Sequence, residues 1–525
     1  MRTHVIGALL GLSLIAGAAG AEESVIPRFE IRRFMLEGNT KLPADQIAKI
    51  FSEHTGKERD FGDIQQTIEQ LEQAYHKHGY TLVTVVLPEQ ELDRGEVRLQ
   101  VIEPKVKKIN VVGNTHFSRE NIIRSLPALQ NNVQPQVTHV SESLRSANEN
   151  PAKKLTLQFA ALEKPEELQA TVQVKDQRPW KVALSGDNTG TKQSGYYRMG
   201  LTLQHANLFD LDHVAAVQYI TSPDHLDKVK IVSGSYRIPL YSLGDTIDLF
   251  GGYSDVDNGT SKISGTDLTI SGKGVVSGFR YNLTLPRAGR YEQKLMMGVD
   301  YRLYDNTVSL AGVELGKDVV AHPFSMTYGA SWQDEKLVVE GYAGVLHNEP
   351  WGGQGKQEDF SAVRNSSKAD YWIFRYGFNK MLKLPHDWIV RTSGNGQYSP
   401  DRLIPGEQFG LGGANAVRGY EEREEAWDHG FNGSLEVYSP DIARLLRLPQ
   451  SQFRLVGFFD GGVGYNQRVQ SGEQIGNTLK SAGTGFRLGI GEFFSFSLDW
   501  GYALDNSTTT RRGDSAVHFK GQLVY

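Results

Sequence analysis

Polar and apolar residues alternate with a period of two over residues 177–525 of the chain. The runs Tyr197–Gln204 and Phe496–Tyr502 show the pattern clearly. Side chains of a strand point alternately to its two faces, so the alternation predicts a series of strands, and the Gly, Asn, Asp and Pro clusters between them predict hairpin turns. At roughly 20–22 residues per strand and connection, this tract accommodates about 16 antiparallel strands.

The alternation alone would also suit a soluble array of β-sandwiches. Many Tyr, Phe and Trp residues, however, lie on the apolar face close to the ends of the expected strands. Aromatic residues in that position form the interfacial girdles of membrane β-barrels, which favours a transmembrane barrel. The mean hydropathy of −0.39 does not argue against it, because lipid-facing and lumen-facing residues average out along each strand.

The region before this tract contains an internal repeat. Phe34–Thr40 ends in Gly-Asn-Thr, and Ile109–Thr115 repeats the pattern. In both copies a helix-start signal follows the Gly-Asn turn, and helical and then strand-like patterns come after it. The order β-α-α-β-β, twice, predicts two small α+β domains at residues 22–103 and 104–176. A pair of α+β domains with an unknown binding role is the simpler alternative.

Residues 1–21 have the composition of a secretory signal peptide. The cationic Arg2 precedes an apolar run from Val5 to about Ala18, and Ala19-Gly20-Ala21 forms a cleavage site, so we expect the mature protein to begin at Glu22. A single-span anchor is the rival interpretation, but the run is short and lacks stop-transfer flanks.

The composition excludes several kinds of chemistry. With no cysteine, the exported chain folds without disulfides and has neither a catalytic thiolate nor a cysteine-bound metal. A net charge of −5 does not indicate a nucleic-acid binder. His76 and His78 would point to different faces of a helix and are poor metal ligands, and neither a phosphate-binding loop nor a nucleophile elbow is present. We therefore expect no enzyme activity, no metal and no cofactor.

Two short motifs carry the most specific chemistry. Gly412–Tyr420 is a glycine-rich loop with one arginine, Arg418, and Phe458–Gly462 lies in a predicted strand. By strand parity Asp460 shares a face with Phe458, and in a membrane barrel this face is the lumen. A carboxylate confined there calls for a cation, and Arg418 is the candidate.

We therefore expect the loop to fold back into the lumen, with Arg418 meeting Asp460. Glycines at 412, 413 and 419 suit a loop that approaches the wall closely, because glycine has no Cβ and tolerates positive φ. A solvated Arg418 is the alternative. For the acidic cluster after the loop we expect a solvated face, with contact to cargo as a minority interpretation. The cluster comprises Glu421, Glu422, Glu424 and Glu425.

The C-terminus provides a further signal. Phe519 and Tyr525 lie on the apolar face of the last predicted strand, together with Val517, Gly521 and Leu523. Closing a barrel pairs this strand with the first one and removes both edges. A terminal aromatic residue resembles the signal by which outer-membrane barrels are recruited to the barrel-assembly machinery.

Taken together, these motifs resemble those of a known family. The loop Val417-Arg418-Gly419-Tyr420 and the strand Phe458-x-Asp460-x-Gly462, after two POTRA-like repeats, resemble two-partner secretion transporters of the haemolysin and filamentous-haemagglutinin exporter type. The resemblance implies a barrel in the outer membrane lipid and POTRA domains in the periplasm. It further implies that these domains capture the N-terminal secretion domain of a large exoprotein, which crosses the barrel unfolded.

Other interpretations remain open. An outer-membrane insertase of the same superfamily usually carries more than two POTRA domains, and a passive porin or uptake channel needs neither those domains nor the Arg418 loop. An outer-membrane enzyme would need a nucleophile and base that we do not find. About ten residues separate Glu22 from the first expected strand, so we expect no plug helix. We expect the Arg418 loop and the remaining extracellular loops to occlude the lumen. The cargo could be an adhesin, a cytolysin or a contact-dependent toxin.

Overall fold

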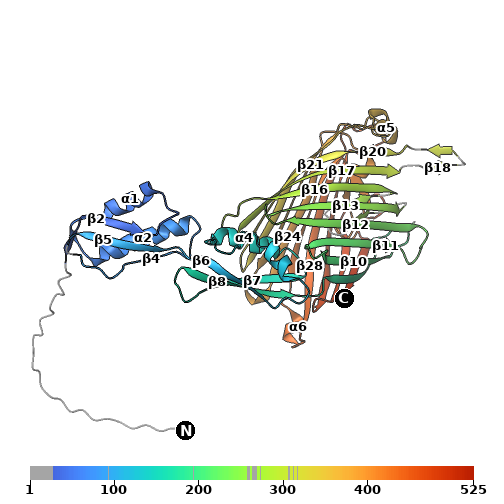
Figure 1. Cartoon of the computed structure of the whole chain (residues 1–525). Coiled ribbons are helices and arrows are strands. Elements are labelled where there is room, and N and C mark those ends of the chain that lie inside the picture. The colour runs from blue at the N-terminus through green and yellow to red at the C-terminus, as the bar shows by residue number, and fades with distance from the viewer. Residues whose placement is uncertain are drawn as a thin grey trace, which may run out of the picture. The chain divides into compact units, whose positions relative to one another are not determined.

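The computed structural model describes residues 28–92, 94–192, 194–256, 260–262, 269–271, 273–305, 308–310, 313–315 and 317–525 (Figure 1). The expected signal peptide, residues 1–21, lies outside the described residues. The chain forms two compact units. The smaller comprises the chain up to Lys107 with Asn131–Thr138 and Ala161–Leu168, and the larger comprises Lys108–Gln130, His139–Ala160 and Gln169–Tyr525.

The first α+β domain has a three-stranded sheet in the order β2-β5-β4, with β2 and β5 parallel. Helix α2 begins at a capping box in which Asp60 and Asp63 bind each other's backbone N–H groups, and it buries Ile64, Leu71 and Tyr75 against the sheet. Its elements are β1 (Phe29–Ile31), β2 (Arg33–Glu37), α1 (Ala44–His54), β3 (Gly56–Arg59), α2 (Phe61–Lys77), β4 (Thr84–Val86) and β5 (Glu96–Ile102).

Two details differ from the expected order. A short strand, β3, lies between the helices and pairs with β1, and the first of the two strands that follow the helices is only the three residues of β4. The side chain of Glu72 on α2 accepts the Val85 backbone N–H at 2.9 Å. A helix side chain thus satisfies a backbone donor of this edge strand that has no partner within the sheet.

The second domain has a sheet in the order β6-β8-β7. Its elements are β6 (Lys105–Val112), α3 (Arg119–Arg124), α4 (Val137–Ala147), β7 (Lys153–Ala161) and β8 (Glu167–Asp176). The sequence repeat has a common geometry in both domains. Gly38 and Gly113 have φ of 83° and 86°, and a Cβ at either would lie 2.5 Å from a carbonyl oxygen of the adjacent strand, so both turns require glycine.

The rest of the larger unit is a closed antiparallel barrel, in which the last strand pairs with the first. Within the described residues it has 16 strands, with β20 and β21 together forming one of them, which confirms the predicted fold class. The barrel strands are β9 (Trp180–Asp187), β10 (Arg198–Leu208), β11 (His213–Thr221), β12 (Val229–Leu240), β13 (Asp245–Val256), β16 (Lys273–Thr284), β17 (Tyr291–Asp305), β20 (Val319–Ala321), β21 (Pro323–Gln333), β22 (Leu337–Asn348), β23 (Trp372–Lys383), β24 (Ile389–Tyr398), β27 (His429–Tyr438), β28 (Ser451–Tyr465), β29 (Gly476–Ile490), β30 (Phe494–Ala503) and β31 (Ser515–Val524).

Minor elements lie in the connections between barrel strands. These are β14 (Thr260–Lys262), β15 (Thr269–Ser271), β18 (Val308–Leu310), β19 (Val313–Leu315), α5 (Gln357–Val363), η1 (Pro385–Asp387), η2 (Pro405–Glu407), β25 (Phe409–Leu411), β26 (Glu425–Trp427) and α6 (Ile442–Leu445). None of the helices in the described ranges is long and apolar enough to cross a membrane.

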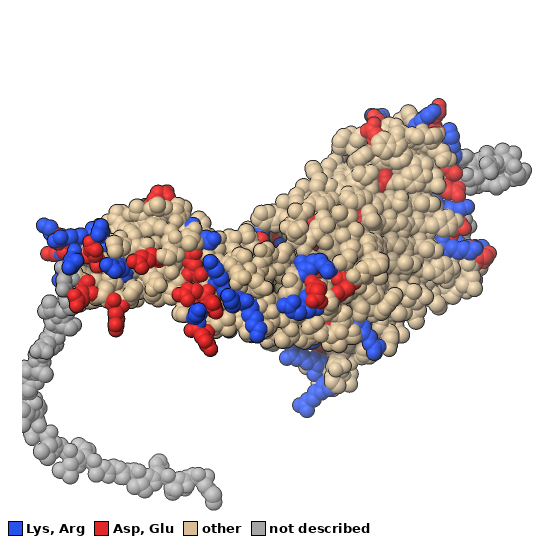
Figure 2. Space-filling model, in the orientation of Figure 1, with Lys and Arg blue, Asp and Glu red and all other residues tan. Residues whose placement is uncertain are grey.

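The two faces of the barrel strands have opposite character. On β28, Leu455 and Phe459 are about half exposed on the outer wall, whereas Phe458 and Asp460 are buried on the inner wall. Figure 2 shows that the visible outer wall carries few charged side chains between the two rims. This surface is the one that a lipid bilayer would cover.

The two rims differ in the length of their connections. The rim nearest the second domain has short turns such as 209–212 and 241–244, while the opposite rim has long connections such as 349–371 and 399–428. At the first rim, Lys153 of β7 forms an ion pair with Asp212, and both side chains are fully buried. Asn121 of α3 and the Tyr241 hydroxyl also bind the Asp212 carboxylate, at 3.1 and 2.6 Å. This Lys153–Asp212 cluster fixes the second domain to the barrel turns.

Candidate functional site: the loop in the barrel lumen

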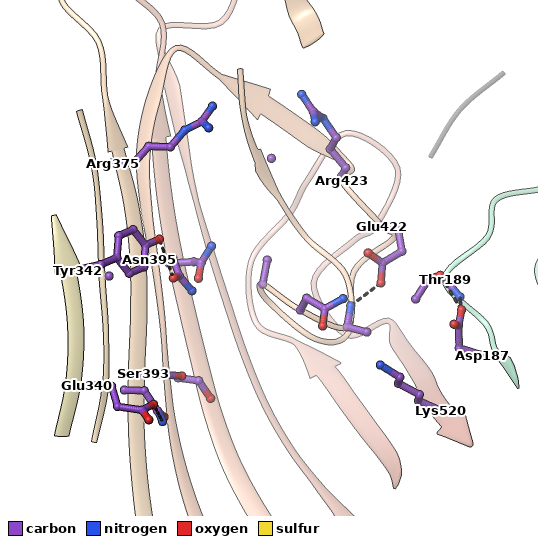
Figure 3. A pocket seen from close by; sticks show the side chains of 18 of the residues that line it. Asp187, Thr189, Glu340, Tyr342, Arg375, Ser393, Asn395, Glu422, Arg423 and Lys520 are labelled. Carbon is purple, nitrogen blue, oxygen red and sulfur yellow. Dashed lines mark hydrogen bonds between the residues drawn. The ribbon is translucent and has the colours of Figure 1, made fainter. Parts of the chain in front are cut away.

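The connection between β24 and β27 lies inside the barrel. Parts of the loop 410–423 line a lumenal cavity of about 1290 Å³, together with inward-facing residues of the wall strands. Figure 3 shows Glu422 of the loop on the side of Asp187, and Arg423 on the side of Arg375, where its guanidinium donates to the Pro405 and Gln408 carbonyl oxygens at 2.6 and 3.0 Å. The loop therefore lies within the barrel lumen and forms part of the boundary of this cavity.

Arg418 is the point at which the loop meets the wall. Its guanidinium donates two hydrogen bonds of 2.7 Å to the two carboxylate oxygens of Asp460, and its backbone N–H donates a third of 3.1 Å. Arg418 is 5% exposed and Asp460 is fully buried. Bidentate geometry and burial make this pair a strong and directional contact.

The guanidinium has further partners on the same wall. It donates to Glu436 of β27 at 2.8 Å and to Ser434 at 3.0 Å, and it lies 3.4 Å from Asp499 of β30. The Phe458 ring stacks on its other side, with the guanidinium carbon 3.5 Å from the ring centroid. The aromatic residue of the strand motif thus contacts the arginine of the loop motif by a cation–π interaction.

Two other arginines balance the remaining charge. Arg391 reaches Glu436 at 3.3 Å, and Arg487 binds both oxygens of Asp499 at 2.7 and 2.9 Å. Three arginines therefore face three carboxylates on this part of the wall. In a lumen of restricted volume, such matching avoids an unpaired buried charge.

Apolar contacts hold the loop on both sides of Arg418. Val417 and Tyr420 are fully buried in a cluster with Leu411, Trp427, Leu479 and Ala503. The Tyr420 hydroxyl lies 2.9 Å from the Lys480 carbonyl oxygen and accepts the Asp505 N–H at 3.2 Å. In the Val-Arg-Gly-Tyr sequence, Val417 and Tyr420 thus anchor the loop through apolar packing, and Arg418 between them forms the ion pair with the wall.

Glycines allow the loop to approach the wall closely. Gly412, Gly413 and Gly419 have φ of 93°, 98° and 95°. A Cβ at Gly462 would lie 2.8 Å from Leu411 and 3.0 Å from Val417, so the glycine of the strand motif makes room for the loop. Gly501 does the same for Gly419, since a Cβ there would lie 2.6 Å from the Gly419 nitrogen.

The expectation of a solvated acidic cluster after the loop is wrong for three of its four residues. Glu422 accepts the Ala414 N–H at 2.6 Å, and Glu424 accepts the N–H groups of Thr509 and Thr510 at 2.7 Å each. Glu425 is 5% exposed and binds Asn477 and Ser507. These carboxylates tie the loop to itself and to the 504–514 connection, whereas Glu421 is exposed.

Sequence reasoning did not single out several residues that complete the site. Glu436, Asp499 and Gly501 belong to this group, as does His518, whose Nε2 accepts the Gly419 N–H at 3.0 Å. A second anchor was also missed: Glu407, in the same long connection, is buried and binds Arg302 of β17 at 2.8 and 2.9 Å. All but Glu407 lie on barrel strands at positions that alternate with apolar residues, which is the signal that could have pointed to them.

The residues expected to direct assembly lie at the seam. Tyr525 exchanges backbone hydrogen bonds of 2.8 and 2.9 Å with Val182 of the first barrel strand, β9, and its side chain is 87% exposed. Phe519 is half-buried among the outer-wall rings of Tyr197 and Phe496. Both rings lie at the face expected to meet lipid.

Over the described ranges, no group of three or more His, Asp or Glu side chains could hold a metal ion. The chemistry that the lumen offers is ion pairing and hydrogen bonding along a polar wall.

Two small α+β domains followed in the chain by a closed barrel, with a loop docked on the inner wall of the barrel, define an outer-membrane transporter of the POTRA-plus-barrel class. A sequence model of the haemolysin secretion/activation protein family, ShlB/FhaC/HecB, matches residues 169–488. A model of the ShlB-type POTRA domain matches residues 29–104. The chain belongs to this family and is a two-partner secretion transporter of the outer membrane, with its POTRA domains in the periplasm, which confirms the resemblance.

Curated relatives support the same assignment. The heme/hemopexin transporter protein HuxB of Haemophilus influenzae is 21% identical over 490 residues, which cover 89% of this chain and 82% of that protein. The outer membrane transporter CdiB of Dickeya dadantii is 20% identical over 424 residues, 77% of this chain and 71% of that protein. Both match across the domains and the barrel.

Solved structures show the same fold. CdiB from Escherichia coli superposes with a TM-score of 0.77 at 19% identity and covers 98% of this chain and 93% of that one. BamA from Haemophilus ducreyi, lacking POTRA domains 1–3, superposes with a TM-score of 0.53 at 14% identity and covers 95% of this chain and 100% of that one.

Proposed function

We propose that the two α+β domains capture a large exoprotein in the periplasm and that the exoprotein crosses the barrel as an unfolded chain past the Arg418 loop. Capture takes place through the N-terminal secretion domain of the cargo. The proposed domain boundaries are residues 22–103 and 104–176 for the capture domains and 177–525 for the barrel.

The observation that carries this proposal is the docked loop. A passive pore needs no loop across its lumen, and the cavity of about 1290 Å³ beside the loop is too small for a folded exoprotein domain. An extended chain is about 5 Å wide at its backbone and about 10 Å wide across its side chains. A chain of this width can pass a polar lumen once the loop moves aside. We propose that the loop closes the lumen at rest and that the arriving cargo displaces it.

The α+β domains offer a physical means of capture. In the first, β4 and β2 lie at the two edges of the sheet. An exposed edge can accept an extended peptide as an additional strand through backbone hydrogen bonds, which bind many sequences with modest strength. Affinity of micromolar strength or weaker would allow release into the barrel.

The test is deletion of the capture domains. A chain with either domain removed should insert its barrel into the outer membrane but secrete no cargo, because capture is lost while the barrel and its C-terminal seam are intact. Assembly is followed by heat-modifiable mobility on gels, and secretion by cargo in the medium. Normal secretion by a barrel that lacks both domains would refute the proposed capture role.

An insertase is the second candidate, favoured by the fold shared with BamA. The two functions make different demands. An insertase would support assembly of unrelated barrels, whereas a transporter would not. Depletion of this protein should therefore stop export of one exoprotein and leave the levels of other outer-membrane barrels unchanged. We propose that this chain itself reaches the membrane through the barrel-assembly machinery.

A further inference from the structure

One connection at the periplasmic rim is unusual in length and composition. The turn between β27 and β28, residues 439–450, contains α6, whereas the other turns at this rim span ranges such as 209–212, 334–336 and 491–493. Figure 1 shows α6 projecting from the barrel beyond the strands it joins. A tight hairpin would suffice to join two antiparallel neighbours, so the extra residues call for an explanation.

The tip of this connection exposes a cluster of large apolar side chains. Leu445, Leu446 and Leu448 are 73%, 67% and 51% exposed. The base is well anchored, since Ala443 is buried and the Asp441 carboxylate accepts the N–H groups of Ala443 and Phe453 at 3.1 and 2.9 Å. The leucines are therefore presented on a fixed support.

Two arginines accompany the leucines. Arg444 and Arg447 are exposed, and neither forms an ion pair with any described residue. Asp387, on the neighbouring turn, is already bound by Arg454 at 2.8 Å and by the Asp441 N–H at 3.0 Å. The tip thus combines apolar surface with two cations available to an external anion.

The surroundings of the tip are those of the lipid-facing wall. Below it, Val437 and Leu455 are exposed on the outer faces of β27 and β28. The turns on either side carry exposed Trp388 and Phe493, and Gln450 of the tip accepts the Gly491 N–H at 2.6 Å. Aromatic residues in such positions mark the level of the lipid headgroups.

We propose that the α6 tip, Arg444–Leu448, inserts into the periplasmic leaflet of the outer membrane. The leucines enter the acyl-chain region beside the barrel wall, and the two arginines bind phospholipid phosphates at the leaflet surface. Continuity with the lipid-facing wall favours phospholipid over cargo as the occupant. On β28 the lumenal face, which includes Arg454, is opposite to the face of Leu455. The proposal depends on the membrane location of the barrel and not on the capture of cargo.

The absence of native cysteine allows a direct test. Leu446→Cys, carrying a nitroxide spin label, is reconstituted as the full chain into vesicles of phosphatidylethanolamine and phosphatidylglycerol. Leu455→Cys on the outer wall and Glu163→Cys on the exposed β7–β8 turn are the lipid and water references. The label at 446 should collide more with oxygen than with a water-soluble nickel chelate, as at 455 and opposite to 163. A water-like ratio at 446 overturns the proposal.

Two further measurements separate the alternatives. Arg444→Gln with Arg447→Gln should shift the label at 446 toward the nickel chelate, and an unchanged ratio overturns the phosphate contact. A label that is water-exposed in vesicles and becomes protected only when the exoprotein is added would identify a cargo surface, and so overturns insertion. Heat-modifiable mobility of each variant verifies that the barrel is folded. If a variant no longer secretes cargo but its label remains in lipid, the insertion proposal stands and the result bears only on the proposed export function.

Discussion

The carboxylate of Asp460 depends on a single cation. Among the described residues only Arg418 lies within ion-pair distance of it, whereas Glu436 is also reached by Arg391 and Asp499 by Arg487. The two members of the loop–wall pair are therefore not equivalent. Without the Arg418 side chain, Asp460 keeps two hydrogen bonds and no cation: the Ser434 hydroxyl at 2.6 Å and the backbone N–H of residue 418 at 3.1 Å. Without Asp460, Arg418 keeps two carboxylates.

Arg418→Ala and Asp460→Ala should both reduce secretion sharply, and Arg418→Ala should do so more. Breaking a buried pair leaves an uncompensated charge, which costs about 3–5 kcal/mol in a fully buried site and less where water enters. The loop then has no fixed position on the wall, and we expect it no longer to clear the lumen in a defined way when the cargo arrives. Secretion of the exoprotein per assembled barrel is the measurement.

The double variant should secrete no less than Arg418→Ala alone, because both substitutions remove the same interaction. Arg391→Ala is the matched control, since it removes a cation from Glu436 but leaves Asp460 paired. Additive losses in the double variant, or full secretion by Arg418→Ala, would show that loop and strand are not coupled.

A second ion pair, between Glu473 and Arg402, lies in the outer connections. It leads to a prediction of how the order of these connections depends on pH. Glu473 accepts hydrogen bonds from Arg402 at 2.6 and 2.5 Å, and these bonds, with the Gln470 N–H, lower the pKa of Glu473 from 4.5 to about 2. The stabilisation of a group with a lowered pKa is complete above its ordinary pKa and is lost as pH falls through the lowered value.

The outer connection 466–475 should therefore keep its order at pH 4 and lose it as the pH approaches 2. Glu473→Gln should be less ordered at neutral pH, and the acid-dependent step should disappear from its profile. Hydrogen exchange of the 466–475 amides as a function of pH measures both effects. An identical profile in wild type and Glu473→Gln would contradict the prediction.

The sequence is sufficient to predict the pair of Arg418 and Asp460, but not the contacts of Arg418 with Glu436 and Asp499. Parity along β28 puts Phe458 and Asp460 on one face, and glycine and arginine chemistry indicates a partner in the loop. The contacts to Glu436 and Asp499 depend on the register between strands, in which Ser434 is opposite Asp460, and on how far the loop descends. The buried roles of Glu424 and Glu425 were missed because Thr510 and Asn477 are far away along the chain.

At the scale of secondary-structure elements, the Lys153–Asp212 cluster connects β7 and α3 of the second domain to the β10–β11 turn. Lys153 also binds the Asn121 side-chain oxygen at 2.9 Å, so its ammonium group is held by two partners in a fully buried site. Such a connection restricts the angle between a periplasmic domain and the barrel rim.

Lys153→Met should loosen this junction by about 3–5 kcal/mol, because it leaves the buried Asp212 carboxylate without a cation. Adding Asp212→Asn should restore most of the loss, and Lys154→Met, an exposed neighbour, should have little effect. The rate of limited proteolysis between the second domain and β9 measures the junction. Equal rates for Lys153→Met and Lys154→Met would contradict this role.

Tyr525 at the C-terminus can contribute to assembly in two ways, through its exposed ring and through its backbone hydrogen bonds to Val182. Tyr525→Ala keeps the two backbone hydrogen bonds to Val182 and removes only the exposed ring, whereas deletion of Tyr525 removes both. If the ring is a recruitment signal, Tyr525→Ala should already lower the amount of heat-modifiable barrel in the outer membrane, with Phe519→Ala having a smaller effect of the same kind.

Tyr502→Ala, an outer-wall aromatic on β30, is the control for a general loss of lipid contact. The transport rate per assembled barrel should be unchanged in all three variants. An assembled amount equal to wild type in Tyr525→Ala would contradict the recruitment role.

At the scale of the whole molecule, periodicity and turn chemistry were sufficient to predict the architecture. Alternation over residues 177–525 gave the barrel, and the repeated Gly-Asn turn gave two α+β domains. Local patterns did not reveal β3, because its four residues are too few and too mixed in polarity to show a period of two. They also did not reveal the buried ion pair between Lys153 and Asp212. An ion pair between distant segments leaves no mark on the sequence near either partner.

The long connection that enters the lumen is covalently joined to the barrel strands at the outer rim, where β24 ends at Tyr398 and β27 begins at His429. From there it descends to Arg418, whose partner Glu436 lies near the periplasmic end of β27. A chain arriving from the periplasm would meet the docked segment around Arg418 and push it toward the outer rim, whereas a solute pressing from outside would push it back onto Asp460 and Glu436. If the loop closes the lumen as proposed, we expect it to yield to a chain leaving the periplasm more readily than to a solute entering from the medium.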